Sequence, residues 1–209
     1  AGGYFAWTLI HELKEKTDYH IIAMTSDQKT TVDKYAGLNI ICVSNKEVFS
    51  NPKYLNHTDI LIHTAFCRKS DGQNLVESLK FSKVLFLKAM KNGVKRIINL
   101  SSQSVYGQAN ENLPDETMSV NPRYLYSLAK AANEVLIEGI MEANIGAVDN
   151  SLYTNIRLAS LIGVNNIIPD DIISKFIEDA IYNKTIHIIG GKQKFSFLDI
   201  KDAADAVCR

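Results

Sequence analysis

Cysteine is scarce in this 209-residue chain, and charge of neither sign is in excess. The three cysteines, Cys42, Cys67 and Cys208, lie far apart and form no CxxC pair, so we expect neither a disulfide framework nor a structural zinc site. Free thiols suit a reducing compartment, and we expect a cytoplasmic protein. Lysine plus arginine and aspartate plus glutamate number 23 each, so no broad basic surface invites a nucleic-acid partner.

Long apolar runs are also missing. None reaches the roughly 18 residues that a membrane helix needs, and we expect no membrane partner. The five histidines show no HExxH-like spacing, and we expect no bound metal. The remaining composition, 46% hydrophobic and 22% charged, is typical of a globular protein with one sizeable domain.

Short apolar runs alternate with segments of helical spacing. Asp59–Ala65 and Arg96–Leu100 predict buried strands, and Asn74–Asn92 between them predicts a helix that ends at Gly93. This alternation is typical of an α/β fold, here a Rossmann-type, doubly wound parallel sheet. The other expected strands span residues 20–24, 39–43, 154–158, 186–189 and 196–198, and the other expected helices span 7–16, 46–55, 122–142, 170–183 and 201–207.

A tyrosine and a lysine lie four residues apart in Tyr126-Ser-Leu-Ala-Lys130 and therefore share one face of a helix. A phenol has an unperturbed pKa of about 10, so it needs a nearby cation to exchange a proton near neutral pH. Lys130 supplies that charge, and Ser102, at a strand end 24 residues before Tyr126, can hold a reacting oxygen. Such a set is typical of hydride transfer to or from an alcohol or ketone. YxxxK alone also suits a surface helix, and serines also cap loops, but their combined order favours an active site.

The segment Ala1-Gly-Gly-Tyr-Phe leads directly into a predicted helix. Glycine lets the backbone approach a pyrophosphate, whose charge then meets the helix N-terminus. Gly3 and Ala6 match the second half of such a loop, although an ordinary turn would also suit them. Such a turn normally follows a strand, so we expect a fragment that lacks its first strand and part of its C-terminal region.

Two further strand ends are candidates for cofactor binding. An acidic residue after strand 20–24 would bind the adenosine ribose of NAD, but Thr25 and Ser26 stand there, and Lys29 could meet a 2′-phosphate. NAD, NADP and a loop without a ligand therefore all stay open. Small residues in Ile62-His63-Thr64-Ala65-Phe66 would let a cofactor lie against the backbone, whereas His63 itself is more typical of a structural histidine.

These residues resemble the extended short-chain dehydrogenase/reductase family, in its NAD(P)-dependent epimerase/dehydratase branch. The resemblance runs through nearly all 209 residues, and its most specific part is Ser102, Val105-Tyr-Gly107 and the pair Tyr126 and Lys130. The rest comprises the turn at Gly3, Asp59–Ala65, Gly93-Val-Lys-Arg-Ile, Leu113-Pro-Asp-Glu116, Pro122, Glu134, Arg157 and Phe195-Ser-Phe-Leu-Asp-Ile-Lys-Asp-Ala-Ala204.

The resemblance implies three catalytic roles. Tyr126 would exchange a proton with the substrate oxygen, Lys130 would hold the nicotinamide ribose and lower the tyrosine's pKa, and Ser102 would hydrogen-bond the substrate oxygen. The implied cofactor is NAD or NADP, and the implied substrate is a sugar or nucleotide sugar. The residues expected to bind the cofactor are Gly3, Tyr4, Phe5, Thr25, Ser26, Thr64, Ala65, Phe66, Tyr126, Lys130 and Leu158.

The same resemblance implies an organisation in two regions. Residues 1–155 would form the NAD(P)-binding Rossmann domain without its first strand, and residues 156–209 a partial substrate cap with returning Rossmann elements. Specificity would lie in the loop 108–121 and in the cap after Asn165. Family members often dimerise through two helices per subunit, and the apolar residues of Leu75–Leu87 and Ala132–Ile140 permit such a homodimer.

Several positions depart from the family's pattern. Gln103 and Ser104 stand where dehydratases carry an acidic pair, which argues for an epimerase or reductase. Ser160 replaces an asparagine, Val164 a proline and Lys194 an arginine that are common among members acting on nucleotide sugars. The changes at Ser160 and Val164 motivate a second hypothesis, a non-catalytic NAD(P)-binding regulator or sensor with the same fold.

Overall fold

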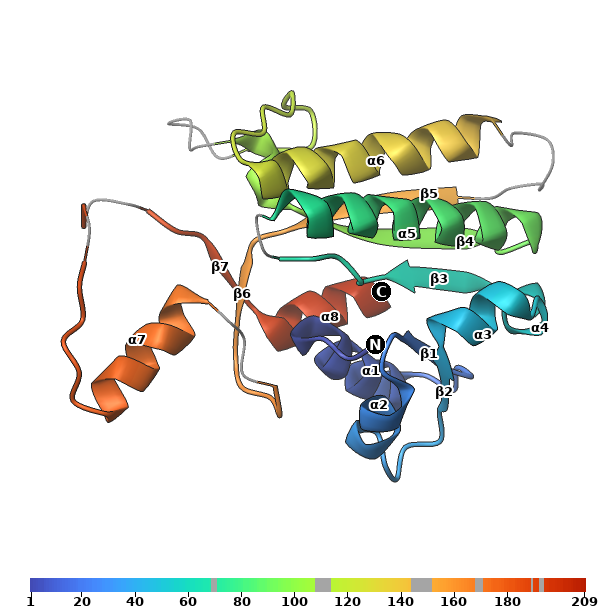
Figure 1. Ribbon diagram of the computed structural model, residues 1–209, viewed down its shortest axis with the longest axis horizontal. Helices are drawn as coiled ribbons and strands as arrows, with labels where there is room; N and C mark the ends of the chain where they lie inside the picture. Colours follow the sequence, from blue (N-terminus) through green and yellow to red (C-terminus); the bar gives the residue numbers. More distant parts are fainter. Residues whose placement is uncertain (69–70, 108–113, 144–151, 168–170, 189, 192–193) are drawn as a thin grey trace. The chain divides into compact units, whose positions relative to one another are not determined.

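A computed structural model shows an α/β protein in which the strand pairs of the described residues are all parallel (Figure 1). It describes residues 1–68, 71–107, 114–143, 152–167, 171–188, 190–191 and 194–209. The described chain forms two compact units, a larger one of Ala1 with Ile22–Leu158 and a smaller one of Gly2–Ile21 with Ala159–Arg209. The α/β class predicted from the sequence is confirmed, whereas the expected domain boundary at residue 155 stays a prediction.

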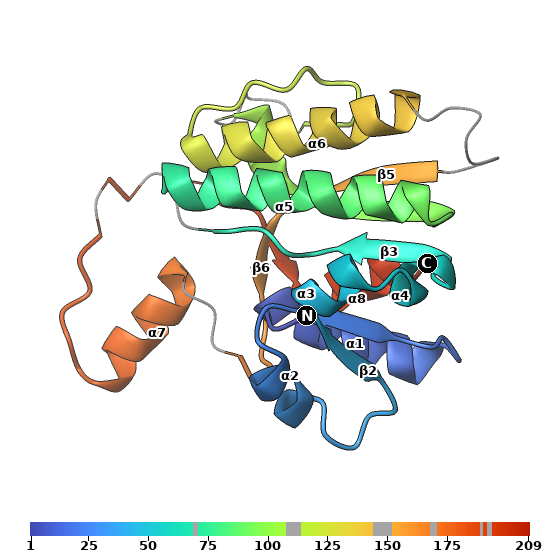
Figure 2. The same ribbon diagram turned by 45° about the vertical axis from the view of Figure 1, so that its right-hand side comes forward.

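The larger unit contains a parallel sheet in the order β3-β4-β5, formed by Ile60–His63, Arg96–Ser102 and Leu152–Leu158. The helices α5 (Gly72–Lys91) and α6 (Leu125–Ala143) connect these strands and lie side by side (Figures 1 and 2). Phe86 of α5, Ile97 of β4 and Ile137 of α6 are fully buried in one apolar cluster. Each such side chain contributes roughly 1.5–3 kcal/mol by leaving water, so this cluster fixes α6 on the sheet.

A second part of the larger unit is the parallel pair β1 (Ile22–Thr25) and β2 (Ile41–Ser44), joined through α2 (Gln28–Lys34). The sequence predicts one helix over residues 46–55, but two are present, α3 (Asn45–Ser50) and α4 (Lys53–Asn56). Pro52 is the N-cap of α4, and a proline inside a continuous helix would remove one hydrogen bond and clash with the preceding turn. The helix α2 was not expected from the sequence.

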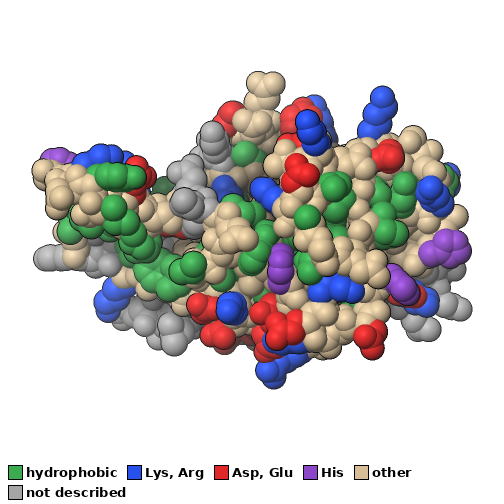
Figure 3. All heavy atoms as spheres, turned by 90° about the horizontal axis from the view of Figure 1, so that it is seen from below, with side chains coloured by type: hydrophobic (Ala, Val, Ile, Leu, Met, Phe, Trp, Pro, Cys, Tyr) green, Lys and Arg blue, Asp and Glu red, His purple; other side chains and the backbone are tan. Residues whose placement is uncertain are grey.

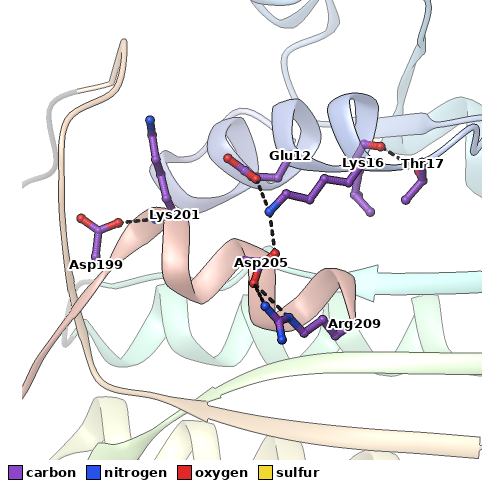
Figure 4. Close-up of polar contacts among 8 residues, drawn as sticks. Glu12, Lys16, Thr17, Asp199, Lys201, Asp205 and Arg209 are labelled. Carbon is purple, nitrogen blue, oxygen red and sulfur yellow. Dashed lines mark hydrogen bonds and ion pairs between the residues drawn. The ribbon is translucent and has the colours of Figure 1, made fainter.

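The smaller unit packs α1 (Tyr4–Lys16) beside α8 (Ile200–Cys208). Ala203 and Ala204 are fully buried, and such short side chains allow the two helices to approach closely. Lys16 of α1 joins the two helices by an ion pair with Asp205 of α8 at 2.5 Å, and it also pairs with Glu12 on its own helix at 2.9 Å (Figure 4). The parallel pair β6 (Ser160–Ile162) and β7 (Phe197–Asp199) completes the paired elements of this unit.

The remaining helix of the smaller unit, α7 (Ile172–Ile181), buries none of its side chains against the described residues. Ile177 and Ile181 are more than half exposed. They are among several large hydrophobic residues exposed in the described chain, and Figure 3 shows hydrophobic side chains at the surface. The strand predicted over 186–189 is wrong for residues 186–188, which form no strand, and residue 189 lies outside the described residues. None of the described helices combines the length and the apolarity of a membrane span.

Candidate active site

Lys130 of α6 is buried and anchored to the central strand β4. Its Nζ donates a hydrogen bond of 2.7 Å to the carbonyl oxygen of Leu100. The same atom lies 4.2 Å from the centroid of the Phe66 ring and 5.9 Å from that of the Tyr126 ring. Burial lowers the pKa of Lys130 to about 8, and the negative charge of Glu134 acts in the opposite direction. An ammonium has three donors, so the bond to Leu100 leaves two for a ligand.

Tyr126 lies in the first turn of α6, beside Lys130. Its ring meets the Phe66 ring edge to face, with centroids 6.3 Å apart. Burial raises the pKa of the phenol, while Arg68 acts to lower it and Cys67 to raise it. The sequence led us to expect that Lys130 would lower this pKa. Burial of Tyr126 outweighs the opposing effect of Arg68 and raises the phenol's pKa, so the phenol is protonated at neutral pH.

Ser102 ends β4 and begins the 3-10 helix η1 (Gln103–Tyr106). Its Oγ accepts hydrogen bonds from the backbone N–H of Ser104 at 3.2 Å and from the Ser104 hydroxyl at 2.9 Å. The Ser102 proton therefore stays available for a further acceptor. Ser102 pairs in register with Leu158, which places the ends of β4 and β5 next to one another.

Gly107 closes the turn after η1, with a φ of 86°. A Cβ atom at this position would lie only 2.4 Å from the carbonyl oxygen of Asn121. The glycine in Val-Tyr-Gly107 is thus required both by the left-handed backbone and by the close approach of a second segment. Residues 108–113, part of the loop expected to determine specificity, lie outside the described residues.

Arg157 of β5 joins the site's helix to η1. Its Nη2 and Nε donate to the Glu134 carboxylate at 2.8 Å and 3.1 Å, and its Nη1 donates to the Tyr106 hydroxyl at 2.8 Å. Glu134 lies on α6 one turn beyond Lys130 and is buried. The resemblance pointed to Glu134 and Arg157, but nothing in the sequence indicated that they pair.

A row of polar side chains that are hydrogen-bonded to one another crosses the sheet β3-β4-β5. His63, Asn99 and Asn155 stand in register on β3, β4 and β5. The His63 Nδ1 lies 3.0 Å from Asn99 Oδ1, and Asn99 Nδ2 donates to Asn155 Oδ1 at 2.7 Å. Asn133 of α6 donates to the same Asn99 oxygen at 2.9 Å. The sequence predicted a structural role for His63 alone. The asparagines at matching positions of the next two strands were the signal that could have revealed the rest of this hydrogen-bonded row.

His63 is completely enclosed in the sheet. Burial lowers its pKa to about 4, and the hydrogen bond with Asn99 only partly offsets this effect. The ring is therefore neutral near pH 7. A neutral, fully buried imidazole that bonds Asn99 and Ser82 has the features of a structural histidine.

The residues of the larger unit that were expected to bind the cofactor differ in exposure and in the hydrogen bonds they already make. The Thr25 hydroxyl is buried and accepts from Thr31 at 3.0 Å, whereas Ser26 is exposed. Thr64 is half-buried and Ala65 exposed just beyond β3. The Phe66 ring contacts the Tyr126 ring and the Lys130 ammonium. Leu158 pairs in register with Ser102 on the neighbouring strand.

In the smaller unit, Gly3 is the N-cap of α1. It is exposed, a Cβ placed on it would meet open space, and no side chain caps this helix end. The first turn contains no acidic residue. Tyr4 and Phe5 are buried, and the Tyr4 hydroxyl donates to the carbonyl oxygen of Gly163 at 2.7 Å, so these two residues can offer a ligand only their main chain. An uncapped helix start behind glycine fits a negatively charged pyrophosphate.

The chain belongs to the NAD dependent epimerase/dehydratase family, which matches residues 1–209. Of the two cofactors predicted from the sequence, NAD is confirmed at the level of this family, whereas NADP stays a prediction. Membership also supports an enzyme of the epimerase/dehydratase type, whereas the roles of Ser102, Tyr126 and Lys130 stay predictions.

Solved structures with the same fold include nucleotide-sugar enzymes. UDP-N-acetylglucosamine 4-epimerase from Methanobrevibacter ruminantium, in complex with UDP-N-acetylmuramic acid, is 21% identical, with a TM-score of 0.79 over 98% of this chain and 68% of that chain. UDP-glucose 4-epimerase from Thermotoga maritima, with UDP-glucose, is 20% identical, with a TM-score of 0.77 over 98% and 69%. MoeE5, in complex with UDP-glucose and NAD, is 21% identical, with a TM-score of 0.82 over 99% and 68%. No curated protein sequence matches the chain significantly.

Within the described residues, no group of three or more histidine, cysteine, aspartate or glutamate side chains could hold a metal ion. The candidate residues at this site carry two hydroxyl groups, those of Ser102 and Tyr126, and the ammonium of Lys130. The described polar groups closest to Tyr126 and Lys130 are suited to proton exchange and to binding neutral or negatively charged oxygens.

Proposed function

We propose that this chain is the cofactor-binding, catalytic part of an NAD-dependent enzyme that epimerises, oxidises or reduces a nucleotide sugar at a secondary alcohol or ketone. The observation that carries the proposal is the arrangement of Lys130, whose Nζ is bonded to Leu100 two residues before Ser102 and lies 5.9 Å from the Tyr126 ring centroid. Residues 1–155 are the proposed cofactor domain, and the protein is proposed to act in the cytoplasm.

Tyr126 is the proposed proton acceptor and donor. The resting phenol of Tyr126 first releases its proton to water. As a substrate C–OH becomes C=O, the substrate's hydroxyl proton passes to the phenolate oxygen of Tyr126, and it returns when the alcohol is re-formed. Bound NAD supplies the reversible hydride acceptor for the substrate carbon. Lys130 stabilises the negative charge on Tyr126 and uses its two remaining N–H groups to hold the cofactor's ribose. Ser102 donates its proton as a hydrogen bond to the substrate oxygen.

A nucleotide sugar is the proposed substrate class because the three similar enzymes described above were solved with UDP-linked sugars or sugar acids. Elimination of water is not proposed. Gln103 and Ser104 follow Ser102 where an acidic pair would be needed, and the Ser104 hydroxyl is engaged with Ser102 at 2.9 Å. Epimerisation or simple redox chemistry needs only the proton exchange that Tyr126 can perform.

Substrates labelled with deuterium at C4 test this proposal. The protein would be incubated with NAD and a panel of UDP- and dTDP-linked hexoses, and the products followed by NMR. An epimerase retains deuterium at an inverted C4, and a redox enzyme transfers it to the nicotinamide. Binding of NAD without conversion of any sugar in the panel would contradict the proposal.

A second candidate is a non-catalytic NAD(P)-binding regulator or sensor. The position of the Phe66 ring favours this second candidate. The ring centroid lies 4.2 Å from the Lys130 ammonium, so the ring covers a group that a catalytic site would need to leave accessible. Titration with NADH and NADPH, combined with the turnover assay, separates the two candidates. A regulator binds a dinucleotide tightly and turns over no substrate, even when Phe66→Ala uncovers Lys130.

A further inference from the structure

Glu134 carries a buried carboxylate one turn beyond Lys130. A lysine and a glutamate four residues apart share a helix face and commonly form an ion pair. Here the pair is not formed: in the described residues, Glu134 binds Arg157, with Nη2 to Oε2 at 2.8 Å and Nε to Oε1 at 3.1 Å. The Lys130 Nζ instead donates to the carbonyl oxygen of Leu100.

Arg157 is itself held in place from a third element. Its Nη1 donates to the Tyr106 hydroxyl at 2.8 Å, and its guanidinium carbon lies 4.8 Å from the centroid of the Tyr106 ring. The planar fork of an arginine can satisfy both oxygens of a carboxylate at once. Glu134 is thus bound to Arg157 from β5, which is fixed in turn by Tyr106 of η1.

We propose that Arg157 is a positioning residue that holds the Glu134 carboxylate away from the Lys130 ammonium. The importance of this role for catalysis rests on the proposed function. Without Arg157, a buried carboxylate lacks a partner, and the nearest lysine on its helix face is Lys130. An ion pair between them would draw the ammonium away from Leu100 and from the Tyr126 ring.

Other titratable groups face Lys130 or its neighbours. Tyr126 shares α6, His63 lies on β3, and Arg68 and Cys67 act on the Tyr126 phenol. His63 has a pKa of about 4 and stays neutral throughout an alkaline titration. Glu134 is the carboxylate whose charge acts on Lys130, so the protonation of Lys130 reports where that carboxylate lies.

The test is the pKa of Lys130, measured by NMR on protein labelled with ¹³Cε-lysine. The resonance is assigned by its absence in Lys130→Met. We expect Arg157→Met to raise this pKa by about one unit or more, because Glu134 then turns to the ammonium. We expect Glu134→Gln to lower it. Loss of the guanidinium charge alone would produce shifts of the same signs, so a second background is needed to distinguish the two causes.

A double-substitution cycle separates release of Glu134 from loss of the arginine's own charge. In the Glu134→Gln background, Arg157→Met should raise the Lys130 pKa by clearly less than in the native background. Rises of equal size in both backgrounds, or no rise at all, would overturn the proposal.

Arg157→Lys keeps the positive charge but lacks the planar fork of the guanidinium. This variant replaces Arg157→Met in the test if circular dichroism shows that Arg157→Met is unfolded. It should still raise the Lys130 pKa, and an unchanged value would contradict the proposal. None of these measurements requires turnover. Expected pKa shifts together with full activity of Tyr126→Phe would therefore refute the proposed function and leave the role of Arg157 intact.

Discussion

The ammonium of Lys130 donates a hydrogen bond of 2.7 Å to the carbonyl oxygen of Leu100. This bond, together with the one from Asn133 to Asn99, ties α6 to β4, and thereby ties the helix that carries Tyr126 to the strand that ends at Ser102. It is made inside the protein, where the charged form of a lysine is disfavoured. The anchoring of the site therefore has a cost in stability that depends on pH.

The free energy of unfolding should rise with pH because of Lys130. Its pKa is lowered from 10.5 to about 8 in the folded protein, so the unfolded chain binds more protons between these two values. Over this window the folded state should gain up to about 3 kcal/mol relative to Lys130→Met, since one pKa unit is worth about 1.4 kcal/mol. Urea unfolding of both proteins at several pH values measures the gain. A difference between them that is flat from pH 8 to 10.5 would show that the lysine is not desolvated.

Acid should destabilise the protein through His63. Burial lowers its pKa from 6.5 to about 4. Between these two pH values the His63 ring is therefore protonated in the unfolded chain but neutral in the folded chain. Stability relative to His63→Gln, which is neutral at every pH, should fall by up to about 3 kcal/mol as pH drops from 6.5 to 4. Unfolding curves of the two proteins measure this loss, and parallel pH profiles would count against a neutral buried ring.

Gly107→Ala should destabilise the protein more than Gly37→Ala. Both glycines have a positive φ, of 86° and 88°, so each substitution costs roughly 1–2 kcal/mol of backbone strain. Only at Gly107 would the new Cβ meet an atom, the Asn121 oxygen at 2.4 Å, and such an overlap adds about 1–3 kcal/mol. Thermal unfolding of the two variants measures the difference, and equal losses would show that Asn121 does not approach the turn.

Val135→Lys should dissociate the homodimer that the outward apolar residues of α5 and α6 permit. The side chain of Val135 on α6 is 66% exposed, and Val84 and Leu87 on α5 are also exposed, so these helices carry outward apolar residues. A charge placed there would be buried in a helix-to-helix interface. Sedimentation equilibrium should show a dimer for the native protein and for Val32→Lys, an exposed valine of α2, but a monomer for Val135→Lys. A native protein that is monomeric at all concentrations would contradict this.

The sequence predicted the elements around the site because their signals are local. Apolar runs predict β3 and β4, and helical spacing followed by Gly93 predicts α5. Tyr126 and Lys130 were placed correctly on one helix because a spacing of four fixes their common face. The strand expected near residue 187 was wrong because a short apolar run also suits an exposed connection; Ile188 is 70% exposed.

What the sequence could not show depends on contacts between distant segments. The bonds of Arg157 to Glu134 and Tyr106 join residues 23 and 51 positions apart. The spacing of Tyr126 and Lys130 likewise reveals the neighbouring cation but not the burial that raises the phenol's pKa. The burial of Tyr126 depends on its packing against Phe66, which lies in the segment after β3 and is distant in the sequence.

The most direct test of the central claim is the turnover number of Tyr126→Phe in the proposed epimerase or reductase reaction. Loss of the phenol oxygen should reduce kcat by about 10²- to 10⁴-fold and leave the affinity for NAD nearly unchanged, because the proton acceptor alone is removed. Tyr124→Phe, an exposed tyrosine two residues earlier, should retain the native rate. A Tyr126→Phe protein that turns over at the native rate would contradict the assignment of this site.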